Sequence, residues 1–397
     1  MNNATKIGGS LIKYHRERLG ITQKELCQGI CVVSHLSKIE NNKVEPSPEI
    51  VVELFNKLGM EYYNDAEFIN TNREKIDKFF TNLNYHRKTN YIFEDIRKEK
   101  DKFLSSPLII DYLLLEAYSA KSKSNIKRLS ELEIYMDTNQ EGWFYLFRAR
   151  YSSKKSKDTI RDWILKGHGL LRNSFSFITL MEFELTQGHF EKVLELGPEI
   201  MNLAIIEGNA MAIAHGNILM GNGYAAQNLP DLMLSYYKRA ENILLDLNRQ
   251  DLIASINYNI GATYFESSEY EKALFYLEKV EKQNTIDDYT RFLLYHKLGL
   301  LYLRLDNNDI AKEYIERAKE MLNSVEGNYK INSLMLEVAE LQLEKDYLDN
   351  PIYLEKLEKL CKILDKKYPI GFYLFHKRML EHLYCHLRQY KKAYLLK

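Results

Sequence analysis

The sequence predicts an all-α protein with a small helical bundle at its N-terminus and a long array of helix pairs behind it. Two observations lead to this fold class. With 18 Gly, 7 Pro and 28% charged residues among 397, the composition favours helices over a turn-rich β architecture. A motif of roughly 40 residues also recurs between residues 210 and 322, as in stacked helical repeats.

The first helices are delimited by strong local signals. Thr22 and Glu25 have the spacing of a capping box at the start of a second helix. Asn41 and Asn42 are expected to stop a third helix, and Ser47-Pro48 to open a fourth. Two short helices joined by a tight turn inside such a bundle are the helix-turn-helix arrangement.

The segments ITQKEL, LSKIENNK and PSPEIVVELFNKLG follow one another in this bundle. In this order and spacing they resemble the lambda-repressor-like (XRE, or Cro/CI) family over about residues 7–59. The turn GICVVS is one residue shorter than the common family form and lacks its glycine, which leaves the start of the third helix open by about one residue. The resemblance also implies an ion pair between Arg16 and Glu40.

In that family the third helix lies in the major groove of double-stranded operator DNA, and its first residues contact base edges. The matching motif positions imply base contacts by Val33, Ser34, His35 and Lys38. They imply a phosphate contact by Gln23, and further backbone contacts are expected from Lys13, Lys24, Asn41 and Lys43. Residues 1–44 carry more Lys and Arg than acidic residues, which suits an approach to phosphates.

The same bundle also allows interpretations without DNA or metal binding. A bundle of this size can serve only as a protein-interaction domain, and His35 can be a surface residue without a DNA contact. Cys27 and Cys31 lie four residues apart, but two thiols without a His pair or further Cys at zinc spacing favour packing over metal binding.

A self-similar pattern is clear over about residues 210–322, whereas residues 70–180 show no clear register. Gly221, Gly261 and Gly299 are followed three residues later by Tyr in each case. The same register holds for Met233, Ala273 and Ala311, and a Tyr follows three residues after each of these as well. The pattern resembles the tetratricopeptide repeat (TPR), although its period exceeds the usual ~34 residues.

A TPR array winds into a superhelix whose concave face binds extended peptides. The inner-face positions that the resemblance implies are His215, Asn222, Tyr258, Asn259, His296, Lys297 and Arg304. An Asn side chain offers one acceptor and two donors and can therefore hold a peptide backbone irrespective of sequence. Lys297 or Arg304 is suited to a terminal carboxylate or an acidic side chain. Each of these residues taken singly is equally well a solvated or inter-repeat residue.

The order of the two parts resembles the RRNPP group of peptide-pheromone regulators. We therefore expect a DNA-binding head (residues 1–64), a linker or connecting helix (65–75) and a TPR-like sensor and dimerisation domain (76–397). The resemblance implies a homodimer that binds operator DNA and is controlled by a short signalling peptide in the concave face. A regulator whose TPR-like body binds a protein partner, and a phage or plasmid regulator with the same parts, are the alternatives.

Several classes of function are not expected. The sequence has no Gly-rich phosphate loop, zinc motif or nucleophile elbow, so we expect no enzyme, cofactor or metal site. It has no signal-peptide pattern and no long apolar run, so no membrane association is expected. Its 4 Cys form no disulfide pattern, which favours the cytoplasm.

Overall fold

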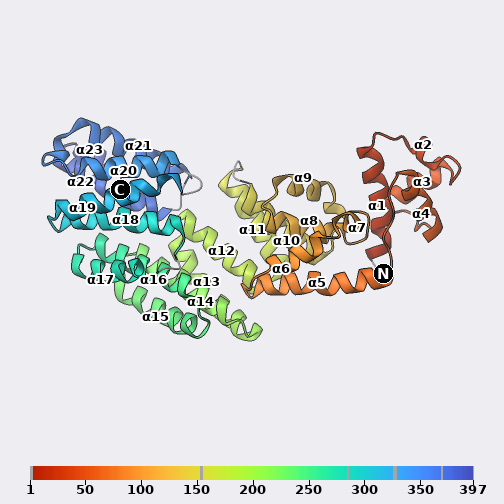
Figure 1. The fold of residues 1–397 in the computed structure, drawn as a ribbon, viewed down its shortest axis with the longest axis horizontal. Helices are drawn as coiled ribbons and strands as arrows, with labels where there is room; N and C mark the ends of the chain where they lie inside the picture. The colour runs from red at the N-terminus through yellow and green to blue at the C-terminus, as the bar shows by residue number, and fades with distance from the viewer. Residues whose placement is uncertain (1–2, 153–154, 284–285, 325–328, 368–369, 397) are drawn as a thin grey trace. The chain divides into compact units, whose positions relative to one another are not determined.

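The computed structural model consists of helices throughout the residues that it describes, which are 3–152, 155–283, 286–324, 329–367 and 370–396 (Figure 1). Side chains are described from residue 8 onward, except 366 and 367. The chain divides into two compact units, residues 1–180 and 181–397. The all-α class with an N-terminal bundle and stacked helix pairs is confirmed.

The first unit begins with a four-helix bundle, whose helices are α1 (Asn3–Arg18), α2 (Gln23–Cys27), α3 (Val33–Glu40) and α4 (Pro48–Lys57). Its core contains Leu11, Ile12, Leu36, Ile39 and Leu54, all no more than 1% exposed. A Cβ atom at Gly9 would lie 2.1 Å from the Ile39 carbonyl oxygen, so a larger residue cannot occupy this position without moving α1 away from α3. This close packing fixes the helix that the sequence predicts to enter the DNA groove.

A second set of helices follows the bundle in the first unit. They are α5 (Ala66–Asn84), α6 (Asn90–Arg97), α7 (Lys100–Leu104), α8 (Ile109–Ser119), α9 (Lys123–Glu131), η1 (Glu133–Tyr135), α10 (Thr138–Tyr151) and α11 (Lys157–Leu171). The segment 65–75, expected to be a linker or a connecting helix, contains the first residues of α5. The bundle packs directly on this set, because the Tyr63 amide donates to the Ser105 carbonyl over 2.9 Å and the His15 ring lies 3.3 Å from the Leu104 carbonyl.

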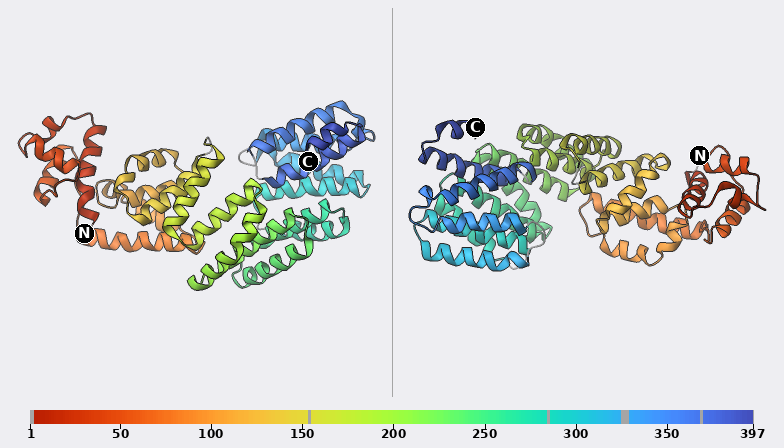
Figure 2. Two further views of the ribbon diagram at one scale, coloured as in Figure 1. Left: turned by 180° about the vertical axis from the view of Figure 1, so that it is seen from behind. Right: turned by 90° about the horizontal axis from the view of Figure 1, so that it is seen from above.

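The second unit is built of helix pairs. The helix α12 (Ser174–Gln187) crosses the division between the units and is followed by α13 (Phe190–Glu207). The pairs that follow are α14 (Ala210–Ala226) with α15 (Pro230–Asp246), α16 (Gln250–Glu266) with α17 (Tyr270–Glu281), and α18 (Asp288–Arg304) with α19 (Asn308–Glu320). After η2 (Met321–Asn323) come α20 (Tyr329–Leu341), η3 (Tyr347–Asp349), α21 (Pro351–Lys367), α22 (Ile370–His386) and α23 (Tyr390–Leu396). Figure 2 shows these helices stacked side by side.

The repeated glycines and tyrosines account for the pairing. A Cβ atom at Gly261 would lie 2.7 Å from Leu277, and one at Gly299 would lie 2.8 Å from Ile315, so each glycine allows the second helix of its pair to approach closely. The repeated tyrosines stack across the same pairs, with ring centroids 5.3 Å apart for Tyr224–Tyr236, 5.9 Å for Tyr264–Tyr276 and 5.6 Å for Tyr302–Tyr314. The predicted repeat therefore corresponds to one packing geometry used three times.

Candidate DNA-binding surface and repeat-domain cavity

The two helices of the helix-turn-helix are fixed by their caps. The Thr22 amide donates to the Glu25 carboxylate over 2.7 Å, and the Glu25 amide donates back to the Thr22 hydroxyl over 3.2 Å. This is the predicted capping box. The bonds from Thr22 lower the pKa of Glu25, because they stabilise its ionised form. The third helix begins at Val33 and follows Val32 without a side-chain cap.

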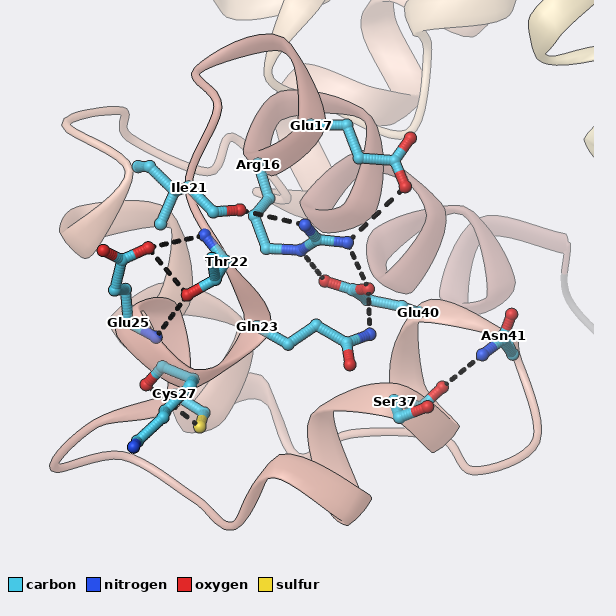
Figure 3. A network of polar contacts seen from close by, with 11 residues as sticks. Arg16, Glu17, Ile21, Thr22, Gln23, Glu25, Cys27, Ser37, Glu40 and Asn41 are labelled. Carbon is cyan, nitrogen blue, oxygen red and sulfur yellow. Dashed lines mark hydrogen bonds and ion pairs between the residues drawn. The ribbon is translucent and has the colours of Figure 1, made fainter.

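A buried polar network connects three of the four helices of the head (Figure 3). Arg16 donates from Nε and Nη2 to the two carboxylate oxygens of Glu40, over 2.6 and 2.9 Å, which is the predicted ion pair. The Arg16 Nη1 donates to the Ile21 carbonyl over 2.9 Å. The hydrogen bond from Glu40 raises the pKa of the Arg16 guanidinium. The network holds α1 to the end of α3 and is structural.

Gln23 has a role in this network that the sequence did not indicate. Its amide nitrogen donates to Glu40 Oε2 over 2.7 Å. One of its two N–H donors is therefore committed to the ion pair, and the second remains for the predicted phosphate contact. The contact expected of Gln23 is narrowed to this one donor.

The outer side of α3 carries the residues predicted to contact bases. Val33, Ser34 and Lys38 are exposed, and His35 is half-buried. Val33 leaves 42% of its surface exposed, and the preceding Val32 leaves 67%, although apolar side chains in the same bundle are almost fully buried. Val32 is a candidate that the sequence analysis did not include.

The residues predicted to contact the DNA backbone lie around this helix. Lys24, Asn41 and Lys43 are exposed, and Lys13 is half-buried. Asn41 donates from its side-chain amide to the Ser37 carbonyl over 2.7 Å at the end of α3. Its side chain thus caps its own helix, which leaves less of it for a phosphate. Cys27 is buried and Cys31 is half-buried, both as free thiols.

The second unit contains a cavity of about 320 Å³ among its helices. We call it the repeat cavity. Its wall includes side chains from α14, α16, α18 and α22. Five residues predicted for the peptide site line it, namely Asn222, Tyr258, Asn259, His296 and Lys297.

Two asparagines from successive first helices meet in this wall. Asn259 donates from Nδ2 to Asn222 Oδ1 over 3.1 Å, and the Tyr237 hydroxyl donates to the same oxygen. The Asn222 oxygen is therefore occupied, and its amide nitrogen and the Asn259 oxygen are left to bond a ligand. Together they offer one donor side and one acceptor side, as a peptide backbone requires.

Lys297 is the cationic residue deepest in the cavity wall. It is 6% exposed, and its Nζ lies 3.2 Å from the centroid of the Phe375 ring. Burial lowers the pKa of Lys297 to about 8, because the charged ammonium is removed from water, and the charge of Glu266 offsets part of this effect. Burial also lowers the pKa of His376 to about 4. A carboxylate that enters the cavity would find in Lys297 its nearest buried cation.

Two residues carried over from the TPR pattern lie outside the cavity lining. Arg304 donates to Gln342 Oε1 over 3.0 Å and to the Tyr347 hydroxyl over 3.5 Å, so it connects α18 to the turn after α20 and to η3. His215 is half-buried on α14, and burial lowers its pKa to about 4. Of the two cations expected to hold a carboxylate, Lys297 lines the cavity and Arg304 does not.

The helix α22 forms a wall of the cavity that the sequence analysis missed. Phe375, His376 and Arg378 all line the cavity. Arg378 forms an ion pair of 2.5 Å with Glu266 of α16, and Phe375 packs on Phe265 with ring centroids 5.7 Å apart. Residues 370–386 lack the Gly and Tyr signature of the repeat, so no pattern placed this helix against α16 and α18.

Comparisons with known proteins agree with this organisation. A helix-turn-helix family model matches residues 12–62, and a tetratricopeptide repeat model matches residues 254–284 and 293–321. The transcriptional activator NprA of Geobacillus stearothermophilus is 25% identical over 332 residues, which cover 77% of each chain. The regulatory protein RapK of Bacillus subtilis (strain 168) is 25% identical over 169 residues, or 42% of this chain and 43% of RapK.

The chain is thus similar to a transcriptional activator and to a Rap regulatory protein, at 25% identity in each case. Two solved structures share its fold. A Rap protein complexed with competence and sporulation factor superposes with a TM-score of 0.66 at 13% identity, over 82% of this chain and 95% of that one. NprR in complex with its cognate peptide NprX gives a TM-score of 0.61 at 15% identity, over 82% and 98%.

The matching family models confirm the expected combination of a helix-turn-helix with TPR repeats, and the chain is similar to a transcriptional activator. Among the described residues, no group of three or more His, Cys, Asp or Glu is arranged to hold a metal ion. Nor does any helix in the described ranges have the length and apolar character needed to cross a membrane.

Proposed function

We propose that this protein is a cytoplasmic quorum-sensing regulator that binds operator DNA as a homodimer and responds to a short peptide bound in the repeat cavity. The observation that carries the proposal is the cavity wall itself. Paired asparagines from α14 and α16 lie there together with the buried Lys297 of α18. Such a wall suits the backbone of an extended ligand and one carboxylate.

The dimensions of the cavity favour a short peptide over a folded partner. A volume of about 320 Å³ accommodates a few side chains, and α22 forms one of its walls. The alternative, a TPR-like body that binds a protein surface, requires a broad open face. The similarity to NprR, whose solved complex contains its peptide NprX, supports the same choice.

For the DNA-binding part, we propose that Val33, Ser34, His35 and Lys38 contact bases and that Gln23, Lys24, Lys13, Asn41 and Lys43 contact the backbone. The exposed surface of α3 supports the first set. A homodimer would present two such helices to two half-sites, as in other helix-turn-helix regulators. The peptide would act by favouring one arrangement of the heads over another.

The test is capture of the ligand by the intact chain. The full-length protein is incubated with conditioned medium or a synthetic library of short peptides, and bound peptides are identified by mass spectrometry. The capture is repeated with N259A and with N202A, which removes an exposed asparagine of α13 outside the cavity. Capture by wild type and N202A, with at least tenfold less by N259A, is the expected result. Equal capture by all three, or capture of a folded protein in place of a peptide, would contradict the proposal.

A further inference from the structure

The first unit contains a second cavity, of about 650 Å³, where the DNA-binding head meets the helices behind it. Tyr14 and Arg18 of α1 line it on one side. Lys100 of α7, Glu116 of α8 and Arg128 of α9 line it on the other. We call it the junction pocket, and neither the DNA-binding surface nor the repeat cavity uses it.

The junction pocket has an excess of positive charge. Its carboxylate, Glu116, is already committed: it accepts from Lys100 Nζ over 3.1 Å and from Asn125 Nδ2 over 2.6 Å. Within the described residues, neither Arg18 nor Arg128 forms an ion pair. Two guanidinium groups therefore face one pocket without an anion to balance them.

Arg128 is held in place while most of its hydrogen-bonding capacity is unused. Its guanidinium lies over the Tyr14 ring, 5.3 Å from the centroid. Its Nε and Nη2 atoms are buried and have no hydrogen-bond acceptor among the described residues. A guanidinium carries five N–H donors in a planar fork that matches the oxygens of phosphate. An aromatic ring orients this fork but does not replace an oxygen acceptor.

The positive potential extends to a neighbouring histidine of α1. His15 is 2% exposed, and its Nε2 lies 3.3 Å from the Leu104 carbonyl. Burial is the main cause that lowers the pKa of His15, and the charges of Arg128 and Arg18 lower it further. The imidazole is thus kept neutral, so it does not add to the repulsion between the two arginines.

We propose that the junction pocket binds a small phosphate-type dianion through Arg128 and Arg18. Ser122 and Ser124 also line the pocket, and their hydroxyls lie 2.9 Å apart in a hydrogen bond with each other, which leaves one of the two O–H donors for a further oxygen of the anion. Paired hydrogen bonds from a guanidinium to phosphate are among the strongest that proteins form. The unpaired Nε and Nη2 atoms are buried, so a free anion or a small phosphorylated molecule reaches them more readily than the backbone of duplex DNA.

The position of the pocket gives this binding a consequence. Arg18 belongs to α1 of the head, whereas Arg128 belongs to α9 of the helices behind it. An anion shared by the two arginines would tie the head to those helices. The orientation of the DNA-binding head would then depend on the concentration of the anion as well as on the peptide.

Inorganic phosphate serves as the probe, with the full-length protein. The midpoint of thermal unfolding is measured at increasing concentrations of sodium phosphate and, separately, of sodium chloride at equal ionic strength. Both salts screen charges to the same extent at equal ionic strength. The variant is R128Q, and the control is R97Q, which removes an arginine of α6 that is 58% exposed and pairs with Glu94 over 3.6 Å. We expect a saturable, phosphate-specific rise of the unfolding midpoint for wild type and R97Q, and at least tenfold weaker phosphate affinity for R128Q.

Three results would overturn the proposal. The first is a response to phosphate no larger than the response to chloride, and the second is an equal response of R128Q and wild type. If R128Q fails to fold, the phosphate response of R18Q is compared with that of wild type instead, because Arg18 is exposed and its loss removes little packing. The third is lower affinity of the variant for duplex DNA without loss of the phosphate response, which would assign these arginines to the DNA backbone rather than to a free anion.

Discussion

Arg16 and Glu40 form a two-pronged ion pair, with Nε–Oε1 and Nη2–Oε2 distances of 2.6 and 2.9 Å, that fastens the first helix of the head to the last residue of its third helix. The Glu40 side chain is 0% exposed and that of Arg16 is 11% exposed. Breaking a pair so far removed from water should destabilise the fold strongly, because it leaves one ion buried without its partner.

The R16A substitution should destabilise the head strongly. It leaves the Glu40 carboxylate buried, with Gln23 as its remaining side-chain donor, and losing one partner of a buried pair costs about 3–5 kcal/mol. Urea unfolding followed by circular dichroism measures this loss. The control is E17Q, because Glu17 is 57% exposed and lies 3.5 Å from Arg16, where a surface pair contributes about 0–1 kcal/mol. Equal stability of R16A and E17Q would refute a structural role for the pair.

Exposed residues of α3 should control affinity for DNA. We expect K38A to weaken binding to a selected operator by about 1–3 kcal/mol if Lys38 contacts a base. K43A should weaken binding to all duplexes alike and reduce the salt slope by about 1, as expected for a phosphate contact. Fluorescence anisotropy over a salt series distinguishes the two effects. A uniform loss for K38A would move Lys38 to the set of backbone contacts.

The glycine of the repeat should not tolerate a methyl group. G261A places a Cβ atom 2.7 Å from Leu277 and 3.2 Å from the Ala273 carbonyl, and such overpacking costs about 1–3 kcal/mol. G169A is the matched control, since nothing lies within 4 Å of a Cβ atom there. In that open helical position alanine should stabilise by up to about 1 kcal/mol. Thermal unfolding midpoints should thus shift in opposite directions.

The state of Lys297 predicts how ligand affinity depends on pH. Its pKa in the folded protein is lowered to about 8 from 10.5, so the ammonium loses its proton as the pH rises through 8. Binding of a peptide carboxylate to Lys297 should therefore weaken between about pH 7 and 9. Calorimetry should show this fall in wild type and not in K297M, which binds weakly throughout. An identical fall in both would assign the pH dependence to another group.

The lowered pKa of Lys297 also affects the stability of the fold. Peptide affinity should fall as the pH rises, whereas the free energy of unfolding should increase. Between about pH 8 and 10.5 the unfolded chain holds a proton on Lys297 that the folded chain has released. The contribution of Lys297 to the free energy of unfolding should therefore increase with pH across this window. Below it, both states are protonated, and the penalty for burying the ammonium is fully present. Wild type and K297M compared by chemical denaturation at pH 7 and pH 9.5 should show a difference that narrows at the higher pH.

Features set by local sequence were predictable. The Thr22–Glu25 capping box and the start of α4 after Ser47 depend on residues within one helical turn. The Arg16–Glu40 pair followed from motif positions, and the stacked tyrosines followed from their regular spacing. In each case the two contacting residues are separated by a number of residues that the motif or the repeat fixes.

Features set by distant packing were not predictable. The Arg378–Glu266 pair joins residues 112 positions apart, and no repeat signal in α22 points to it. Arg304 has a concave-face position in the expected repeat register, but in the structure it donates to Gln342 Oε1 and to the Tyr347 hydroxyl. Helices outside the recognisable repeats thus determine which of the predicted peptide-site residues line the repeat cavity and which pack against other side chains.

Control of DNA binding by the peptide is tested by measuring the affinity of the full-length protein for its operator, with and without a saturating amount of the captured peptide. Coupling between the repeat cavity and the head predicts a change of about 5–150-fold, equivalent to ~1–3 kcal/mol. The change should be lost in N259A and retained in N202A. Peptide binding shown by calorimetry, together with an operator affinity that stays the same, would contradict control of DNA binding by the peptide.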